Sequence, residues 1–164
     1  MKRLPVALLL VSVAIPAATQ SPTTPAKPDL SGTWVFNVQK SSLKVPPPTS
    51  MTLQIDQSGP QIHLARNQVY GDQKFDWKLE AVTDEQKEIV QNSPAYTANI
   101  RIYWEGSSLV LDQKIKASDG TQATDLVTYT LADNGKTLQA VERQTTVGGK
   151  GSTNNKWIYD KQAQ

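Results

Sequence analysis

Apolar and polar residues alternate along most of the chain after residue 30. Residues 51–56 read MTLQID and residues 75–79 read FDWKL, so every second side chain is apolar. A period of two residues places one face of a β-strand in the core and the other in water. This rhythm predicts strands at about 31–38, 50–57, 60–67, 73–80, 97–104, 107–116, 122–131, 137–146 and 152–160.

Turn-like segments separate these runs. Asp-Gly at 119–120 and Asn-Gly at 134–135 supply the positive φ angles that tight hairpins need. Because the connections are short, neighbouring strands are expected to be antiparallel. Consecutively paired strands can close on themselves, which removes exposed sheet edges. The sequence therefore predicts an all-β fold, a single antiparallel up-and-down β-barrel of about eight to ten strands.

Two segments depart from the strand pattern. Residues 82–91 read VTDEQKEIVQ, in which Thr83 can cap a helix and Gln86 completes a capping box. We expect one short helical turn near residues 83–91. Residues 44–50 read KVPPPTS and cannot form the interior of a helix, because proline has no amide donor. We expect that segment to be an extended crossing between the first and second strands.

The chain begins with a segment that is typical of export signals. Lys2 and Arg3 precede an apolar run over residues 4–15, which is short for a membrane span. We predict a signal peptide over residues 1–20, cleaved between Ala17 and Gln20, and an exported protein that is periplasmic or secreted. The alternative, a membrane anchor, is disfavoured by the prolines in this region.

The rest of the chain predicts one domain. Residues 21–29, SPTTPAKPD, are poor in apolar side chains and predict a Pro/Thr-rich disordered tether. Residues 30–161 form the predicted barrel domain. The chain has no cysteine, so packing alone must hold this domain together.

The charge balance narrows the classes of partner. The full chain has 17 Lys and Arg against 15 Asp and Glu. Lys2 and Arg3 are the only charged residues before Ala18, so the predicted mature chain is balanced and has no basic cluster. We therefore expect no nucleic acid and no anionic lipid surface as partner. The sequence does not identify a protein partner.

Gly32-Thr33-Trp34 opens the first predicted strand. A tryptophan there can plug one end of a barrel, and the nearby glycine leaves room for a crossing segment. A G-x-W at this place, followed by a meander of hairpins, resembles the lipocalins and the wider calycin group, which includes fatty-acid-binding proteins and avidin-like barrels. The resemblance implies a barrel that holds a small apolar ligand, with Gly32 and Trp34 in structural roles. It also implies a cation packed over the tryptophan, for which Arg143 and Lys156 are the candidates.

Two further motifs of that group are matched in part. Residues 124–129, TDLVTY, keep Thr124, Asp125 and Tyr129 of the lipocalin T-D-Y motif, with leucine in place of its first tyrosine. Fatty-acid-binding proteins end with an R-x-Y that clamps a carboxylate. Here Trp157 occupies the arginine position and only Tyr159 matches. The resemblance therefore gives little support to carboxylate binding.

The predicted function is non-catalytic binding of a small hydrophobic or amphipathic molecule inside the barrel, without a cofactor or a metal. The candidate ligand-binding residues are the inward aromatic and apolar positions Phe75, Trp77, Ile100, Ile102, Trp104, Tyr129 and Tyr159. An open alternative is that these side chains fill the barrel solidly. The protein would then be an envelope interaction or structural module, with residues 44–50 as its contact.

The sequence offers few candidates for catalysis or metal binding. His63, the only histidine, lies between two apolar residues and is expected on the solvent face. Without cysteine no zinc site of mixed nitrogen and sulfur ligands can form, and no serine lies in a nucleophile-elbow motif. A second alternative is an enzyme that uses Asp125 or Glu142, whose parity leaves an inward orientation open. An outer-membrane barrel is disfavoured because outward positions such as Lys78 and Arg101 suit water.

Overall fold

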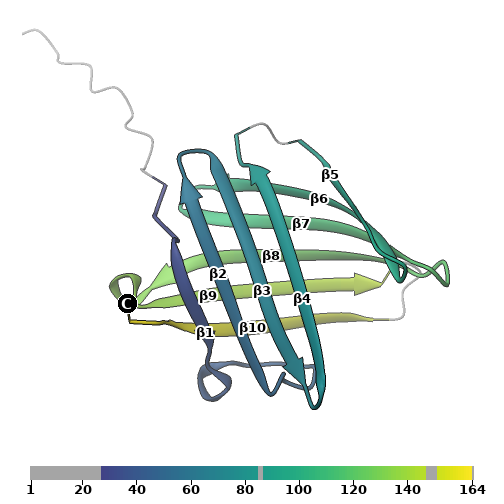
Figure 1. Cartoon of the computed structure of the whole chain (residues 1–164), viewed down its shortest axis with the longest axis horizontal. Helices are drawn as coiled ribbons and strands as arrows, with labels where there is room; N and C mark the ends of the chain where they lie inside the picture. Colours follow the sequence, from purple (N-terminus) through teal and green to yellow (C-terminus); the bar gives the residue numbers. More distant parts are fainter. Residues whose placement is uncertain (1–26, 85–86, 147–150, 164) are drawn as a thin grey trace, which may run out of the picture.

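The computed structural model describes residues 27–84, 87–146 and 151–163. These residues form one ten-stranded sheet in the order β4-β3-β2-β1-β10-β9-β8-β7-β6-β5, in which all neighbours are antiparallel (Figure 1). The strands are β1 (Gly32–Phe36), β2 (Ser50–Ser58), β3 (Gln61–Tyr70), β4 (Gln73–Val82), β5 (Ile89–Asn92), β6 (Tyr96–Glu105), β7 (Ser108–Ala117), β8 (Gln122–Ala132), β9 (Thr137–Thr146) and β10 (Ser152–Lys161). The predicted all-β meander is confirmed.

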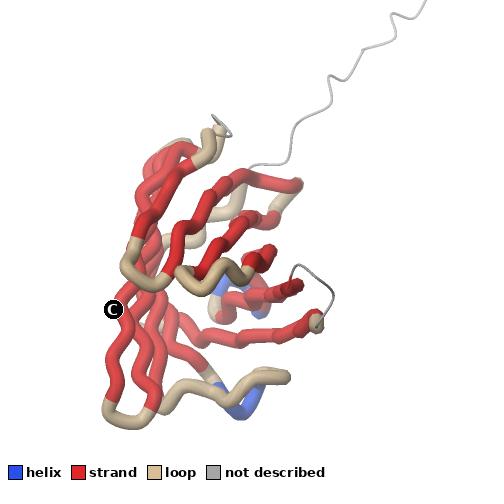
Figure 2. Tube along the Cα trace, turned by 90° about the vertical axis from the view of Figure 1, so that its right-hand side faces the viewer, coloured by secondary structure: helices blue, strands red, loops and turns tan. Residues whose placement is uncertain are grey.

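The two ends of the meander meet because β1 pairs with β10. Trp34 lies opposite Lys161, and Phe36 lies opposite Tyr159. Figures 1 and 2 show how the sheet bends, so that β2–β4 lie across β6–β10 and face them over the interior. β4 and β5 remain at opposite ends of the strand order, so the barrel is nearly closed rather than fully closed.

Side chains span the remaining gap between β4 and β5. The Trp77 indole Nε1 donates a hydrogen bond to Gln91 Oε1 at 3.0 Å. Gln91 Nε2 donates in turn to the Lys78 carbonyl oxygen at 2.6 Å. One glutamine on β5 therefore fastens two positions of β4 where the backbone ladder stops.

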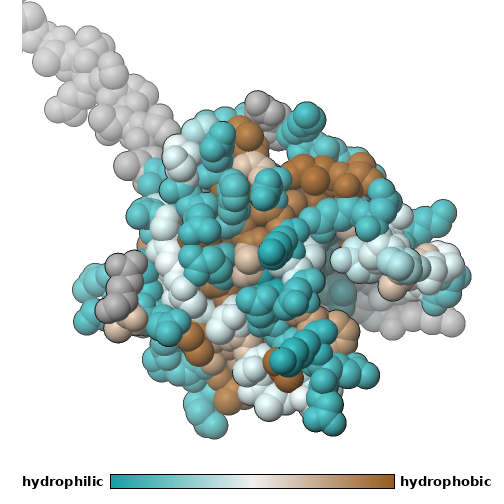
Figure 3. All heavy atoms as spheres, viewed as in Figure 1, coloured by the Kyte–Doolittle hydropathy of each residue, from teal (hydrophilic) through white to brown (hydrophobic). Residues whose placement is uncertain are grey.

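The core follows from the alternation that predicts the strands. Inward positions of most strands contribute to one cluster of buried side chains, and its largest fully buried members are Trp34, Leu30, Leu53, Ile55, Ile62, Leu64, Ile100, Ile102, Leu109 and Leu138. The outward positions are mainly polar, and hydrophilic residues predominate on the face seen in Figure 3. His63 is exposed, as predicted.

At one end of the barrel, a lysine from the last strand covers the tryptophan of the G-x-W motif. Trp34 is fully buried, and its Nε1 donates to the Leu30 carbonyl oxygen at 2.9 Å. The Lys161 Nζ lies 5.1 Å from the centre of the Trp34 ring. Gly32 has φ +137°, and a Cβ added there would lie 2.8 Å from Lys161 Cε. The glycine therefore leaves room for the lysine that covers the tryptophan.

This arrangement corrects one expectation from the sequence. We expected Arg143 or Lys156 over Trp34, and Lys161 occupies that place instead. The register of β1 against β10 puts Lys161 directly opposite Trp34. Arg143 is exposed on β9, and Lys156 is exposed on β10 with the outward parity.

The helical turn expected near residues 83–91 is a second correction. Residues 85–86 lie outside the described residues, and Ile89–Asn92 is the short strand β5. Residues 89–92 form a strand because they pair with β6, and this pairing outweighs the helix-capping signal of Thr83 and Gln86. The two short 3-10 turns lie elsewhere, at η1 (Val38–Lys40) and η2 (Asp133–Gly135). Residues 43–49 contain no regular element, which fits the predicted extended crossing.

The predicted signal peptide lies outside the described residues, as does most of the predicted tether. Residues 27–29, the described end of that tether, have no regular secondary structure. The part of the chain that the structure describes holds no helix that is long and apolar enough to cross a membrane.

The Gly32 position gives a first testable prediction. Gly32→Ala should lower the free energy of unfolding by about 2–3 kcal/mol, because φ +137° is strained for a residue with a Cβ and the new Cβ displaces the end of the Lys161 side chain from Trp34. Gly71→Ala is the matched control, since Gly71 has φ +57° and open space around it, and should cost about 1 kcal/mol. Urea unfolding measures both. Equal losses would contradict the prediction, because neither the backbone at Gly32 nor the displaced Lys161 contact would then add to the ordinary cost of a positive φ angle.

Candidate functional site

The interior of the barrel changes character along its length. On β3 the inward series begins with Ile62 and Leu64, which are buried in the core, and continues with Arg66 and Gln68. On β7, Leu109 and Leu111 are followed by the polar Gln113, although the next inward residue, Ile115, is apolar. One end of the barrel is thus packed with apolar side chains, and the other end carries polar groups on its inner wall.

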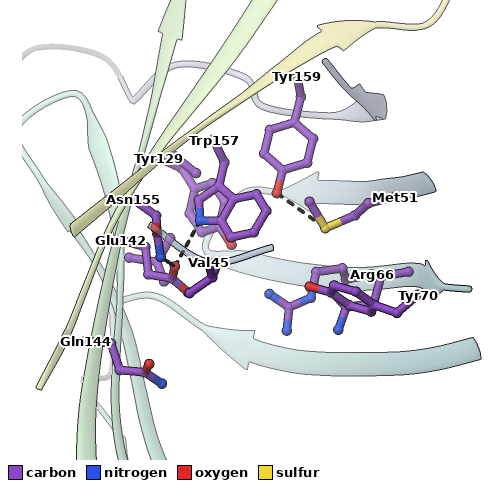
Figure 4. Close-up of a pocket in the computed structure, with 13 residues that line it drawn as sticks. Val45, Met51, Arg66, Tyr70, Tyr129, Glu142, Gln144, Asn155, Trp157 and Tyr159 are labelled. Atoms are coloured by element: carbon purple, nitrogen blue, oxygen red, sulfur yellow. Dashed lines mark hydrogen bonds between the residues drawn. The ribbon is translucent and has the colours of Figure 1, made fainter. Parts of the chain in front are cut away.

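Two cavities lie in the polar end. The first has a volume of about 270 Å³, and its walls include Met51, Tyr129, Trp157 and Tyr159 (Figure 4). The second has a volume of about 570 Å³, and its walls include Phe75, Trp77, Tyr96, Gln113 and Asp125. Four residues line both cavities: Arg66, Gln68, Glu142 and Gln144. The two cavities therefore adjoin one another.

Glu142 is held in place by donors from the neighbouring strand. Asn155 Nδ2 donates to Glu142 Oε2 at 2.6 Å, and Trp157 Nε1 donates to the same oxygen at 2.9 Å. Asn155 is itself fixed, because its Oδ1 accepts from the backbone N–H of Lys44 at 2.7 Å. The crossing segment before β2 thereby positions the carboxylate through Asn155.

Asp125 is a buried acid with one oxygen unsatisfied. Its side chain is 8% exposed, and its Oδ2 accepts from Gln113 Nε2 at 3.0 Å. Its Oδ1 is buried and has no hydrogen-bond partner among the described residues. Burial raises the pKa of Asp125 to about 7, and the nearby Glu142 carboxylate adds to the rise, whereas Arg66 opposes it.

Arg66 supplies the positive charge of the cavity wall. Its guanidinium carbon lies 5.4 Å from the centre of the Trp77 ring, a cation–π contact between β3 and β4. Its Nε is buried without a hydrogen-bond acceptor in the described part of the chain. Four ion pairs occur among the described residues, and Arg66 belongs to none of them.

Two tyrosines complete the wall on the side of β8 and β10. Burial raises the pKa of Tyr129 to about 12. Burial also raises the pKa of Tyr159, whose hydroxyl lies 3.8 Å from the Met51 sulfur. Both phenols therefore stay neutral at physiological pH and present aromatic faces with a polar tip.

The structure places the seven predicted ligand-binding residues in two groups. Phe75, Trp77, Tyr129 and Tyr159 line the cavities, but Phe75 is 46% exposed and is not the enclosed inward position that we expected. The other three belong to the packed end: Ile100 and Ile102 are buried in the core, and Trp104 is half-buried against it.

Sequence reasoning missed Arg66 and Gln68 in the cavity wall. Arg66 and Gln68 continue the parity of Ile62 and Leu64, which is the signal that could have found them. Asp125 and Glu142 both lie on the inner wall, the orientation that the sequence left open. Within the described ranges, no group of three or more His, Asp or Glu side chains could hold a metal ion.

The buried Asp125 gives a second testable prediction. Its folded pKa of about 7 exceeds the ordinary 3.8, so the folded state holds a proton that the unfolded state releases between these values. Stability should therefore fall as pH rises from 4 to 7 and level off above 7. Asp125→Asn removes this ionisation and should stabilise the protein at pH 8 by up to about 4 kcal/mol, with little effect at pH 4.

Urea unfolding at pH 4, 6 and 8 measures this dependence. Asp56→Asn is the matched control, because Asp56 is exposed on β2 and should leave the profile unchanged. An Asp125→Asn profile parallel to that of the unmodified protein would show that Asp125 ionises freely in the folded state.

Known structures share this barrel. Secretory abundant heat soluble protein 4 from Ramazzottius varieornatus matches with a TM-score of 0.52 and 16% identity over 88% of this chain and 100% of that chain. A variant of the fluorescent protein UnaG matches with a TM-score of 0.51 and 16% identity over 82% and 96% of the two chains. Zebrafish ileal bile acid-binding protein, complexed with cholic acid, matches with a TM-score of 0.50 and 14% identity over 81% and 98%.

These likenesses concern the fold. No protein-family model matches this chain, and no curated protein sequence matches it. The chain therefore shares the fold of these proteins, a nearly closed up-and-down β-barrel of ten antiparallel strands.

Proposed function

We propose that this protein binds a small hydrophobic or amphipathic molecule inside its barrel and performs no catalysis. The observation that carries the proposal is the pair of adjoining cavities in the polar end, of about 270 and 570 Å³. Sites for small molecules commonly have volumes of roughly 300–1,000 Å³. The solid-barrel alternative is disfavoured by the same cavities.

The cavity walls suit a molecule with an apolar body. Tyr129 and Trp157 offer aromatic surface in the smaller cavity, and Phe75 and Trp77 offer it in the larger one. Burial of apolar surface contributes about 25 cal/mol per Å², before the losses that ordering imposes. The complex of the zebrafish protein with cholic acid supports the proposal, because cholic acid is an amphipathic molecule and that protein has a similar barrel fold.

The crossing segment favours binding in the interior over a protein contact at residues 44–50. Val45 lines the smaller cavity, and Pro48 is buried. Two residues of the segment are thus packed against the barrel, although Pro46 and Pro47 between them are exposed. The contact of Asp125 with an amide, rather than with a nucleophile, favours binding over catalysis.

We also propose that the protein acts outside the cytoplasm, in the periplasm or in the medium. The support is the order of the first 20 residues: two basic residues, an apolar run, then small and polar residues. Sequencing the N-terminus of protein recovered from the producing cells tests this. A mature chain that begins between Ala18 and Ser21 is expected, and a retained Met1 on the mature protein would contradict it.

Binding in the barrel is tested with N-phenyl-1-naphthylamine, a neutral probe whose fluorescence rises in apolar surroundings. We expect saturable binding of one probe per chain. Gln68→Trp fills a position that lines both cavities, and it should weaken binding at least about tenfold, the equivalent of 1.4 kcal/mol. Asn67→Trp is the matched control, because Asn67 is exposed on the outer face of β3.

The two variants separate binding in the cavity from binding on the surface. Unchanged affinity for Asn67→Trp, with circular dichroism spectra that match the unmodified protein, supports the proposal. Saturable binding that survives in Gln68→Trp, or no saturable binding in the unmodified protein, would contradict it.

A further inference from the structure

The two cavities meet at a polar junction that the proposed function does not itself explain. Arg66, Gln68, Glu142 and Gln144 line both cavities. Arg66 and Gln68 come from β3, whereas Glu142 and Gln144 come from β9, and Figure 4 shows Arg66 and Glu142 on opposite walls. A ligand that occupies both cavities must pass between these four side chains.

The junction offers open donors on one side and open acceptors on the other. In the described residues the Arg66 guanidinium has no ion-pair partner within 4.0 Å, and its buried Nε has no acceptor. Both hydrogen bonds that the Glu142 carboxylate accepts from described residues end on Oε2, so Oε1 can accept from a ligand. A buried donor without an acceptor is costly, so a ligand oxygen that accepts from Arg66 gains affinity, and a ligand N–H can add a hydrogen bond to Glu142 Oε1.

The charges of the junction are balanced before a ligand enters. Arg66 and Glu142 carry opposite charges, and Lys74 and Asp76 do the same at the exposed rim of the larger cavity. Below pH 7 the third acid, Asp125, is mainly neutral, because burial and Glu142 raise its pKa to about 7. A charged ligand group would therefore introduce an unbalanced charge into a partly desolvated space, which is unfavourable.

We propose that the barrel selects a small amphipathic molecule whose polar head is uncharged and carries both a hydrogen-bond donor and an acceptor, as a primary amide does. The head lies between Arg66 and Glu142, accepting from the guanidinium and donating to the carboxylate. The apolar tail lies against Trp157 and Tyr129 in the smaller cavity. This inference rests on the proposed function and adds the chemical class of the ligand.

Four probes with chains of similar length test the head group at pH 6.0. They are octanamide, with donor and acceptor; 2-nonanone, with an acceptor only; octanoate, an anion; and octylammonium, a cation. Isothermal titration calorimetry should give octanamide the highest affinity, by at least about fivefold over each of the others. Octanoate as the tightest ligand would overturn the inference in favour of an anion site at Arg66, and octylammonium as the tightest would overturn it in favour of a cation site.

Charge variants test whether the two named residues cause the preference. Arg66→Met leaves Glu142 unbalanced, so octanamide should bind at least about fivefold more weakly and octylammonium more tightly. Glu142→Gln leaves Arg66 unbalanced, so octanoate should bind more tightly and octylammonium more weakly. Arg143→Met is the matched control, because Arg143 is the exposed neighbour of Glu142 on β9, and it should change none of the four affinities.

The outcomes distinguish this inference from the proposed function. If Gln68→Trp weakens all four probes but octanamide has no advantage, the barrel binds ligands and the head-group inference is wrong. If octanamide leads but Arg66→Met leaves its affinity unchanged, the placement at the junction is wrong. If none of the four probes nor N-phenyl-1-naphthylamine binds, the proposed function fails.

Discussion

The apolar packing around Trp34 stabilises the barrel enough to offset the unfavourable burial of polar groups at its hollow end. Charged groups inside a protein destabilise it by several kcal/mol unless they are paired, stacked or hydrogen-bonded. Fully buried side chains such as Trp34, Leu53 and Ile100 each contribute about 1.5–3 kcal/mol. Contacts at the polar end lessen this destabilisation, because Glu142 accepts two hydrogen bonds and Arg66 stacks on the Trp77 indole. One end of the barrel therefore provides stability and the other provides a site.

Much of the fold was predictable, because the two-residue period acts on each strand independently. The nine predicted strands correspond to β1–β4 and β6–β10. The missed strand, β5, lies in a segment where Thr83 gives a local helix signal, and its structure depends on pairing with β6 across a loop. Lys161 over Trp34 was missed for a related reason. Choosing among the cationic residues requires the register between β1 and β10, which the sequence does not supply.

The site was predictable only in part. Parity placed Trp77 and Tyr129 on the inner face, and both line the cavities in the structure; whether they bind a ligand stays a prediction. Parity could not divide the interior into a packed end and a hollow end, so Ile100 was grouped with them although it is a core residue. The polar wall was missed because a charged residue at an inward position reads as an interruption of the pattern. That Arg66 on β3 faces Glu142 on β9 across a cavity is visible only in the three-dimensional structure.

The central claim is that ligands enter the polar end and leave the packed end undisturbed. The chain has four tryptophans, and their indole N–H signals in a ¹⁵N–¹H NMR spectrum report on both ends. Trp77 and Trp157 line the cavities, whereas Trp34 is bonded to Leu30 in the core. On addition of N-phenyl-1-naphthylamine, the account predicts that the Trp77 and Trp157 signals shift and that the Trp34 signal stays fixed. Shifts confined to Trp34, or no shift in any of the three at saturating probe, would contradict it.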